Sequence, residues 1–274
     1  MSTTDPEIGR TVEAAGIKTY YLEAGTGEAV VLLHGSGPGV TGYANWRLTI
    51  LVLSQRFRVL APDIAGIGYT EREANIFYNL DLWVRHIVGI LDALKIAKAH
   101  FDGNSLGGAL TLAITARHPE RVGKFVLVGA AGTKFRLTPE LDAVWGYEPS
   151  VENMRRLVYS FAYDTSFIND ELIRSRYEAS IRSGFHESYS QLFPALRERH
   201  IALLATPYET IKSLPHSALI IHGCDDRIIP LDTSLRLHGL IARSELHVLG
   251  QCGHWTQIEK KDRFNQVVES FLAA

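Results

Sequence analysis

The sequence has little cysteine and no excess of charge of either sign. Only two cysteines, Cys224 and Cys252, occur in 274 residues, which excludes the dense disulfide framework of small secreted domains. The 28 basic and 30 acidic side chains are spread along the chain and leave a formal net charge of −2. A nucleic-acid-binding surface needs clustered basic residues, so no nucleic-acid partner is expected.

Long apolar runs and metal-binding patterns are also missing. No stretch approaches the length of about eighteen uninterrupted apolar residues that a membrane span needs, and residues 1–10 lack the apolar core of a signal peptide. Neither His-Glu-x-x-His nor a pair of Cys-x-x-Cys motifs occurs. We therefore expect a cytoplasmic protein with two free thiols, no membrane partner and no bound metal.

The sequence instead alternates short β-rich runs with segments of helical periodicity. A hairpin is predicted for Thr11–Ala15 and Lys18–Glu23, and the later β-rich runs are Val30–Leu33, Phe57–Ala61, His100–Asp102, Phe125–Val128, Ala218–Ile221 and Glu245–Leu249. The predicted helices between them are Trp46–Gln55, Leu80–Leu94, Leu106–Arg117, Thr233–Ile241 and Asp262–Leu272. Strands that alternate with helices predict a mostly parallel, doubly wound α/β sheet with helices on both faces.

The alternation stops between residues 133 and 214. This stretch is expected to form helices only, at Leu141–Trp145, Met154–Phe161, Glu171–Ile181 and Ser188–Leu204. We therefore predict a core domain from residues 1–132 and 215–274, with residues 133–214 inserted as a helical cap. In α/β sheets ligands bind at the carboxyl ends of the strands, so a cap over those ends is expected to close a pocket. The alternative is a cap that is only structural filler.

A Gly-x-Ser-x-Gly pattern at residues 103–107 is the most informative motif. A short predicted strand leads into Gly103-Asn104-Ser105-Leu106-Gly107, and a predicted helix follows. This strand–turn–helix context is typical of a nucleophile elbow, in which a strained turn presents the serine hydroxyl. A Cβ at Gly103 or Gly107 would crowd so tight a turn. The pattern also arises by chance, and the alternative is a Gly-rich loop at the start of a helix.

Two later loops supply the partners that such a serine needs. A nucleophilic serine requires a base and a group that orients the base, and in this fold the acid precedes the histidine in the chain. Asp225 and Asp226 follow the run that ends at Ile221, and His254 follows the last β-rich run. Asp226 is preferred as the acid because it lies deeper in its loop. Ser105, Asp226 and His254 are thus the predicted catalytic residues.

The glycine-rich turn after the run 30–33 predicts part of an oxyanion hole. Its sequence is His34-Gly35-Ser36-Gly37-Pro38-Gly39, and hydrolases with a nucleophile elbow take one oxyanion-binding amide from a loop at this place. The second amide belongs to the residue after the nucleophile, here Leu106. A phosphate-binding loop is the alternative, but the turn contains neither Gly-x-Gly-x-x-Gly nor a Walker lysine.

Three of these segments together resemble the meta-cleavage product hydrolases. They are the turn at 34–39, the elbow at 103–108 and Cys252-Gly253-His254-Trp255. The similarity extends from about Pro6 to Phe271 and includes the cap segment 141–150, which is most similar to 2-hydroxymuconate semialdehyde hydrolases and their alkyl-substituted relatives. The resemblance implies an α/β-hydrolase fold, with an eight-stranded, mostly parallel sheet and an inserted helical cap.

The resemblance also implies an activity. Members of this family hydrolyse the C5–C6 carbon–carbon bond of 2-hydroxy-6-oxohexa-2,4-dienoates, small molecules formed when catechol rings are opened, to 2-hydroxypenta-2,4-dienoate and a carboxylic acid. The implied protein is a serine hydrolase of aromatic degradation that needs no cofactor, and a homo-oligomer, either a dimer or larger. Asn104 and Trp255 distinguish the carbon–carbon hydrolases from ordinary esterases.

Further site residues follow from the resemblance alone. Arg176 matches the cap arginine that binds the dienoate carboxylate, for which a planar guanidinium is suited. Without the resemblance it would be one more solvated helix arginine. Ser36 would supply its amide to the oxyanion hole, and Phe161 would face the variable C6 end. The other substrate-binding residues that the resemblance implies are Gly35, Gly37, Asn104 and Trp255.

Three positions depart from the pattern of this family. Asp102 stands where an apolar residue usually precedes the elbow, and there it would be a buried carboxyl group with a raised pKa. Cys224 replaces a common arginine, and Leu196 replaces a frequent proline. None of the three removes a catalytic group.

Two other functions share these motifs. A promiscuous carboxylesterase would use the same triad, and a non-catalytic ligand receptor would keep the pocket without turnover. A haloalkane dehalogenase is excluded because it needs an acid where Ser105 stands. The residues leave open which C6 substituent is preferred, and whether Ser105 forms an acyl-enzyme or assists a gem-diol route.

Overall fold

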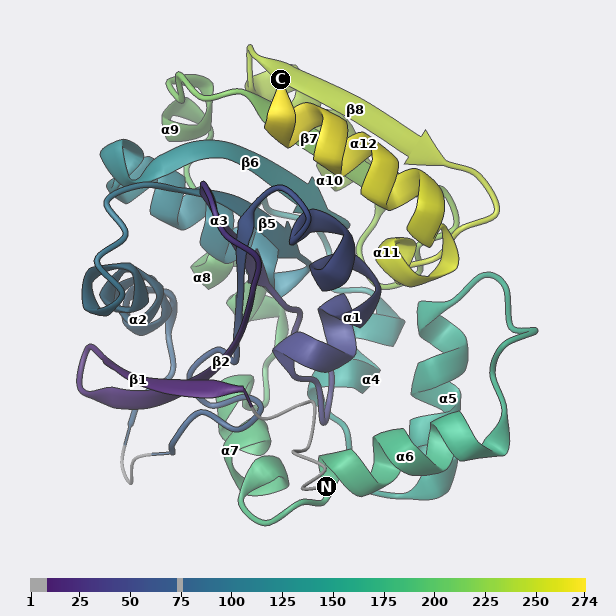
Figure 1. The fold of residues 1–274 in the computed structure, drawn as a ribbon. Coiled ribbons are helices and arrows are strands. Elements are labelled where there is room, and N and C mark those ends of the chain that lie inside the picture. The colour runs from purple at the N-terminus through teal and green to yellow at the C-terminus, as the bar shows by residue number, and fades with distance from the viewer. Residues whose placement is uncertain (1–8, 73–75) are drawn as a thin grey trace.

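The centre of the molecule is a single sheet (Figure 1). The structure, a computed structural model, describes residues 9–72 and 76–274; most of the N-terminal segment for which no signal peptide is expected lies outside these residues. Within them, eight strands are ordered β1-β2-β4-β3-β5-β6-β7-β8. The strands are β1 (Arg10–Ala14), β2 (Ile17–Ala24), β3 (Ala29–Leu33), β4 (Arg58–Pro62), β5 (Ala99–Asn104), β6 (Val122–Val128), β7 (Ala218–Gly223) and β8 (Ser244–Leu249).

Most neighbouring strands run parallel. The pairs β1–β2 and β2–β4 are antiparallel, and the other neighbouring pairs, from β4–β3 to β7–β8, are parallel. The predicted eight-stranded, mostly parallel α/β sheet is confirmed. Because parallel strands end at one edge of the sheet, the loops that follow β3, β5, β6, β7 and β8 meet at that edge.

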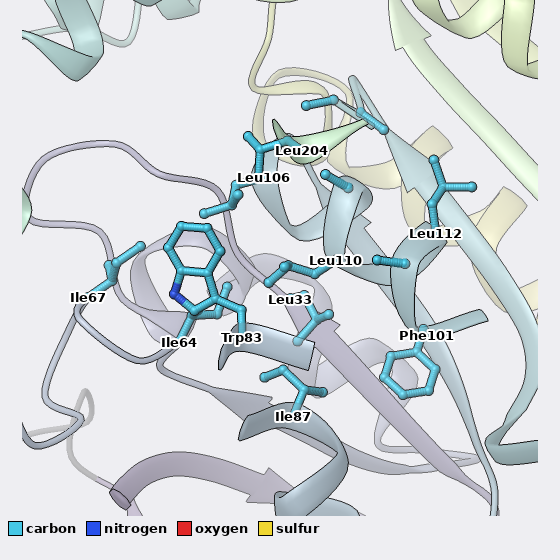
Figure 2. Packing of buried hydrophobic residues seen from close by; sticks show 14 of the residues in the cluster. Leu33, Ile64, Ile67, Trp83, Ile87, Phe101, Leu106, Leu110, Leu112 and Leu204 are labelled. Atoms are coloured by element: carbon cyan, nitrogen blue, oxygen red, sulfur yellow. The ribbon is translucent and has the colours of Figure 1, made fainter. Parts of the chain in front are cut away.

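Helices cover both faces of the sheet (Figure 1). On one face, α1 (Gly42–Leu53) and α12 (Lys261–Ala273) bury Trp46 and Phe264 in a cluster with residues of β3, β4, β6 and β7. On the other face, a larger cluster lies under α2 (Leu80–Ala93), α3 (Leu106–Arg117) and α10 (Leu231–Leu240); Figure 2 shows part of it. The short helices η1 (Pro119–Arg121) and α11 (Thr256–Glu259) complete the core. Nowhere in the described ranges is a helix long and apolar enough to span a membrane.

Many helices begin at a side chain that caps the first turn. The free N–H groups of a helix's first turn need acceptors, and Ser, Thr and Asn oxygens supply them. This occurs at α1, α2 and three helices of the segment 133–214, whose capping residues are Thr41, Asn79, Thr138, Ser150 and Asn169. Each such cap stabilises its helix by about 1 kcal/mol.

Residues 133–214, all of which the structure describes, contain helices and no strand. They are α4 (Pro139–Trp145), α5 (Val151–Phe161), α6 (Asp170–Ser180), α7 (Phe185–Leu192), α8 (Glu198–Leu204) and α9 (Tyr208–Lys212). The N–H of Thr206 donates to Gly132 O (2.9 Å), so the chain leaves the core and returns to it at one point. α9 packs on α3 and α10. We propose that this segment is the cap, with α9 as its base on the core.

The prediction of one helix over residues 188–204 is wrong. The structure has two helices there, α7 and α8, separated at residues 193–197. Proline disfavours helical backbone at the residue before it and has no N–H to donate, and Phe193, before Pro194, is not helical, with φ −134° and ψ 70°. Leu196 has φ 65°, so the chain turns sharply between the two helices.

Asp102 lies in the middle of the sheet, and its carboxyl group has no hydrogen-bond partner among the described residues. It is 0% exposed on β5, in register with Leu32 of β3 and Val126 of β6. Both neighbours belong to the cluster under α1 and α12, so the Asp102 side chain enters the same layer. Neither carboxyl oxygen has a hydrogen-bond partner in the part of the chain that the structure describes. Burial raises the pKa of this group well above its ordinary value, so it is protonated.

We expect Asp102→Val to stabilise the protein more at pH 7 than at pH 4. In the unfolded chain the carboxyl group ionises above its ordinary pKa of 3.8, whereas the folded protein keeps the proton, so the free energy of unfolding decreases as the pH rises. Valine favours strands and has no polar atom to bury, which predicts a gain of about 1–3 kcal/mol at pH 4 and a larger gain at pH 7, where the unfolded chain is ionised. Urea unfolding at both pH values measures the gain, and an equal gain at pH 4 and pH 7 would contradict the argument.

Candidate active site

Ser105 lies at the sharp turn between β5 and α3. Its backbone has φ 56° and ψ −113°, a conformation that residues with a side chain rarely adopt. The turn is held by the Ser105 N–H, which donates to Val128 O of β6 (3.0 Å), and by Ser105 O, which accepts from the N–H of Ala131 (3.0 Å). Strand, strained turn and helix thus have the geometry of a nucleophile elbow.

The elbow requires glycine because backbones touch there. A Cβ at Gly107 would lie 2.1 Å from Leu33 O, and a Cβ at Gly103 would lie 2.3 Å from Gly107 O. A Cβ at Gly108 would lie 2.3 Å from the Cβ of Ala130. Non-bonded atoms do not approach so closely. The first turn of α3 can therefore meet β3 and the end of β6 only because all three positions lack a side chain.

A histidine and an acid contact one another on the loops after β8 and β7. Nδ1 of His254 lies 2.7 Å from Oδ2 of Asp226, and their side chains are 3% and 1% exposed. The other carboxylate oxygen accepts from the N–H groups of Ile228 (2.8 Å) and Ile229 (3.0 Å). Asp225, the alternative acid, is exposed and accepts from a backbone N–H of the histidine loop instead. With Nδ1 held by Asp226, Nε2 is the nitrogen available for proton transfer.

Asp226 stays ionised although it is buried. Burial raises the pKa of this carboxyl group, but the attraction of His254 and the hydrogen bonds from His222 and His254 outweigh it, so the pKa lies well below its ordinary value. Nε2 of His222 lies 3.4 Å from Oδ2 of Asp226 and donates to Ile229 O (3.0 Å). Its Nδ1 accepts from the Ser234 hydroxyl (2.6 Å). The ionised carboxylate thus holds the His254 ring through its Nδ1.

His34 holds the glycine-rich turn after β3. Its Nδ1–H donates to Gly35 O (2.7 Å), and its Nε2 accepts from the N–H of Ile64 (3.0 Å). Burial lowers the pKa of His34 to about 4, so the ring is neutral at pH 7, with one donor and one acceptor. Because the peptide is trans, the N–H of Ser36 points away from Gly35 O and from this ring. The N–H of Leu106, at the first position of α3, has no acceptor within the helix.

One small cavity, of about 40 Å³, brings most of the predicted residues together. Its wall includes Gly35, Ser36, Gly37, Asn104, Ser105, Phe161, Arg176, His254 and Trp255. Asp226 and Leu106 are not part of the wall: Asp226 lies behind His254, and the Leu106 side chain packs in the core cluster (Figure 2). The apolar side chains of the wall come mainly from the cap and include Leu141, Val144, Met154, Val158 and Ile228.

Arg176 turns toward this cavity while its neighbour on the same helix does not. Arg176 is half-buried, and its Nη2 donates to Pro38 O in the glycine-rich turn (3.2 Å). Arg174 is exposed. On the facing wall the rings of Phe161 and Trp255 stack, with centroids 5.1 Å apart and planes 5° apart. The cavity thus contains a guanidinium group together with a serine and an imidazole.

Three residues of the site have no signal in the sequence. Asn45 lines the cavity at 8% exposure, and its amide nitrogen has no hydrogen-bond partner among the described residues, which suits a donor to a ligand. A Cβ at Gly129, after β6, would lie 3.0 Å from Oδ2 of Asp226. Glu259 accepts from the N–H of Gly253 (2.8 Å) and from two N–H groups of the cap. The approach of Gly129 to Asp226 and the contacts of Glu259 with the cap join segments far apart in the chain, which local patterns do not report.

The two cysteines lie near the acid and histidine loops. Both are free thiols, as predicted, with Cys224 exposed and Cys252 buried. Burial raises the pKa of the Cys252 thiol to about 12, so it is a poor nucleophile. No group of three or more metal-ligating side chains occurs within residues 9–72 and 76–274.

Comparison with known proteins finds relatives that match the whole chain. The sequence profile of the α/β hydrolase fold matches residues 28–261. A 2-hydroxymuconate semialdehyde hydrolase of Pseudomonas sp. (strain CF600) is 55% identical over 268 residues, 98% of this chain and 95% of that protein. A 2-hydroxy-6-oxo-2,4-heptadienoate hydrolase of Pseudomonas putida is 53% identical over 274 residues, 100% of this chain and 99% of that protein. The solved structure of a meta-cleavage product hydrolase from Pseudomonas fluorescens IP01 is 56% identical and superimposes with a TM-score of 0.97, covering 98% of this chain and 99% of that one.

We expect His34 to make the protein less stable as the pH falls from 6.5 to 4. Over this interval the unfolded chain binds a proton at the residue and the folded protein does not, which costs up to about 1.4 kcal/mol per pH unit. His34→Gln keeps a donor and an acceptor but does not titrate. Its free energy of unfolding, measured in urea at several pH values, should therefore fall less steeply than that of the wild type. Parallel pH profiles would show that His34 titrates normally in the folded protein.

Proposed function

Because this chain belongs to the meta-cleavage product hydrolases of the α/β hydrolase fold, we propose that it hydrolyses the C5–C6 bond of 2-hydroxymuconate semialdehyde or of its 6-alkyl analogues. The products are 2-hydroxypenta-2,4-dienoate and a carboxylic acid, which is formate when C6 carries hydrogen. These substrates arise when catechol rings are opened, so the activity belongs to the degradation of aromatic compounds.

The observation that carries this proposal is the presence of an arginine and an elbow serine in one cavity. Ser105 and Arg176 both line it. An esterase needs the serine and histidine but no cationic group, whereas a dienoate carries a carboxylate that a guanidinium can bind with two parallel hydrogen bonds. Two relatives more than half identical to this chain are named for such dienoates.

The first step is ketonisation of the dienol. The 2-hydroxyl group loses its proton and C5 gains one, so C2 becomes a ketone conjugated to a C3–C4 double bond. We assign the substrate carboxylate to Arg176 and to the unpaired amide of Asn45, and the proton transfer to His254. Protonation at C5 is essential because only then can the C5–C6 bond break with its electrons delocalised.

The second step is hydrolysis at C6. Ser105, or a water that it orients, attacks the C6 carbonyl as His254 takes the proton, and the N–H groups of Ser36 and Leu106 stabilise the oxyanion. When the tetrahedral intermediate collapses, the C5–C6 electron pair passes through C3–C4 to the C2 oxygen, which is protonated to the dienol. Asp226 stabilises the imidazolium between these events. One water is consumed in all: it attacks C6 directly, or it hydrolyses the acyl-Ser105 ester and releases the carboxylic acid.

The cavity favours a small group at C6. At about 40 Å³ it has room for about three water molecules, and the apolar side chains Val144, Val158 and Phe161 line it. We therefore propose hydrogen or a short alkyl chain at C6 rather than an aryl ring. Any hexadienoate is larger than this space, so the wall must move outward on binding, and a small C6 group requires the least movement.

The direct test is to mix the protein with the yellow ring-fission products of catechol, 3-methylcatechol, 3-isopropylcatechol and 2,3-dihydroxybiphenyl. We expect loss of visible absorbance, fastest for the first two. Ser105→Ala, as the matched control, should bind these compounds but lose turnover by at least about a thousandfold. No absorbance loss with any compound, alongside rapid hydrolysis of a simple aryl ester, would show an esterase instead.

We expect Arg176→Gln to impair dienoate turnover while sparing small neutral esters. Glutamine keeps polarity but not the charge and fork that meet a carboxylate, so kcat/KM for the dienoate should fall by about a hundredfold. The exposed Arg174→Gln on the same helix is the control and should behave like the wild type. Equal losses on dienoate and ester would mean that Arg176 does not bind the carboxylate.

A further inference from the structure

Ser36, in the glycine-rich turn, is held by two buried side chains of the cap. Nε1–H of Trp145, at the end of α4, donates to the Ser36 hydroxyl (3.0 Å). The Tyr189 hydroxyl, on α7, donates to Ser36 O (2.9 Å). Trp145 and Tyr189 are 4% and 5% exposed. Two separate helices of the cap therefore reach the same residue of the core.

Both side chains are themselves fixed. The Tyr189 hydroxyl also lies 2.6 Å from Val144 O, so its single proton is shared between α4 and the turn. Burial raises the pKa of Tyr189 well above its ordinary value, so the hydroxyl remains a donor at any working pH. The Trp145 ring stacks on Phe193, with centroids 4.2 Å apart and planes 12° apart. Neither side chain can rotate without losing these contacts.

These contacts define the orientation of the peptide that carries the Ser36 N–H. His34 binds Gly35 O (2.7 Å), which belongs to the same planar peptide as that N–H. Tyr189 binds the carbonyl of the next peptide, and Trp145 binds the side chain between the two. With both flanking peptides and the side chain held, the backbone torsions of Ser36 have little freedom. Its N–H is the remaining polar group, and it is the proposed oxyanion donor.

We propose that Tyr189 is a positioning residue of the oxyanion hole, acting through the Ser36 carbonyl, with Trp145 as the second tether. The proposal rests on the proposed function, since it concerns the same site. The cap then does more than cover the substrate: it sets the direction of a group that stabilises the transition state. A donor that loses its direction stabilises the oxyanion less, although the substrate binds as before.

The expected defect is therefore in the chemical step at C6. In the dienolate, part of the negative charge lies on the C6 oxygen, and protonation at C5 removes it, so a misdirected donor should not slow ketonisation. Hydrolysis at C6 should slow by about tenfold, which is less than the loss caused by deleting a donor outright. KM should stay within about twofold of the wild-type value.

Tyr189→Phe removes only the hydroxyl group, and Tyr147→Phe is the matched control. Tyr147 is also buried in the cap (4% exposed), and its hydroxyl pairs with Ser180 Oγ (3.0 Å) inside the cap and not with the turn. Stopped-flow absorbance would separate ketonisation from C–C cleavage in each variant, and thermal unfolding would measure the stability that each hydroxyl contributes. Trp145→Phe tests the second tether, because it can keep the stack on Phe193 while losing the N–H.

We expect Tyr189→Phe to slow cleavage but not ketonisation, Tyr147→Phe to change neither, and both to lower the melting temperature. Unchanged cleavage in Tyr189→Phe, or equal slowing in both variants, would overturn the proposal, because the hydroxyl would then be only structural. Hydrolysis of an aryl ester also passes through an oxyanion, so measuring it in each variant separates this outcome from failure of the proposed function. If the dienoate is not turned over at all, a slower ester hydrolysis in Tyr189→Phe alone still supports the positioning role, and an unchanged one overturns it.

Discussion

The site depends on one contact, the backbone-to-backbone approach of α3 to the sheet at the elbow. Gly107 meets Leu33 O at a distance that leaves no room for a Cβ. This closeness forces Ser105 into a strained conformation at φ 56°. It also brings the first N–H groups of α3 beside the turn that follows β3. The proposed nucleophile and oxyanion donors therefore share a single geometric cause, and a methyl group at one glycine would displace all of them.

Two buried carboxyl groups show how the surroundings decide charge. The side chains of Asp102 and Asp226 are both almost fully buried. Asp226 receives two backbone N–H groups and contacts two imidazoles, and it stays ionised. Asp102, on β5, meets apolar side chains and no donor within the described residues, and it stays neutral. The first lies where a charge supports proton transfer; the second contributes nothing that compensates for its burial.

How much of the fold and site could be predicted from the sequence depends on how close together in the chain the residues of each feature lie. The elbow was predictable because its glycines and Ser105 lie within five residues, with a strand-like run before them and a helix-like segment after them. The acid and histidine loops could be located by chain order alone. The boundary between α7 and α8 was missed because helical periodicity continues through Pro194. The break is made instead by the backbone torsions of Phe193 and Leu196, which are not helical. Asn45 and Glu259 were missed because tertiary packing alone creates the cavity that Asn45 lines and brings the cap N–H groups to Glu259.

The hydrogen bond between Thr206 and Gly132 holds the two ends of the cap together, so that the cap forms a closed loop on the core. Closing a long loop costs only slightly more than closing a short one, since the entropy grows with the logarithm of length. The core therefore tolerates caps of many lengths, and exchanging one should be a route to new substrates. Tyr189 and Trp145 limit that freedom. A transplanted cap must bring a donor to Ser36 from each of two helices, or the new pocket will hold its substrate over a misaligned oxyanion hole.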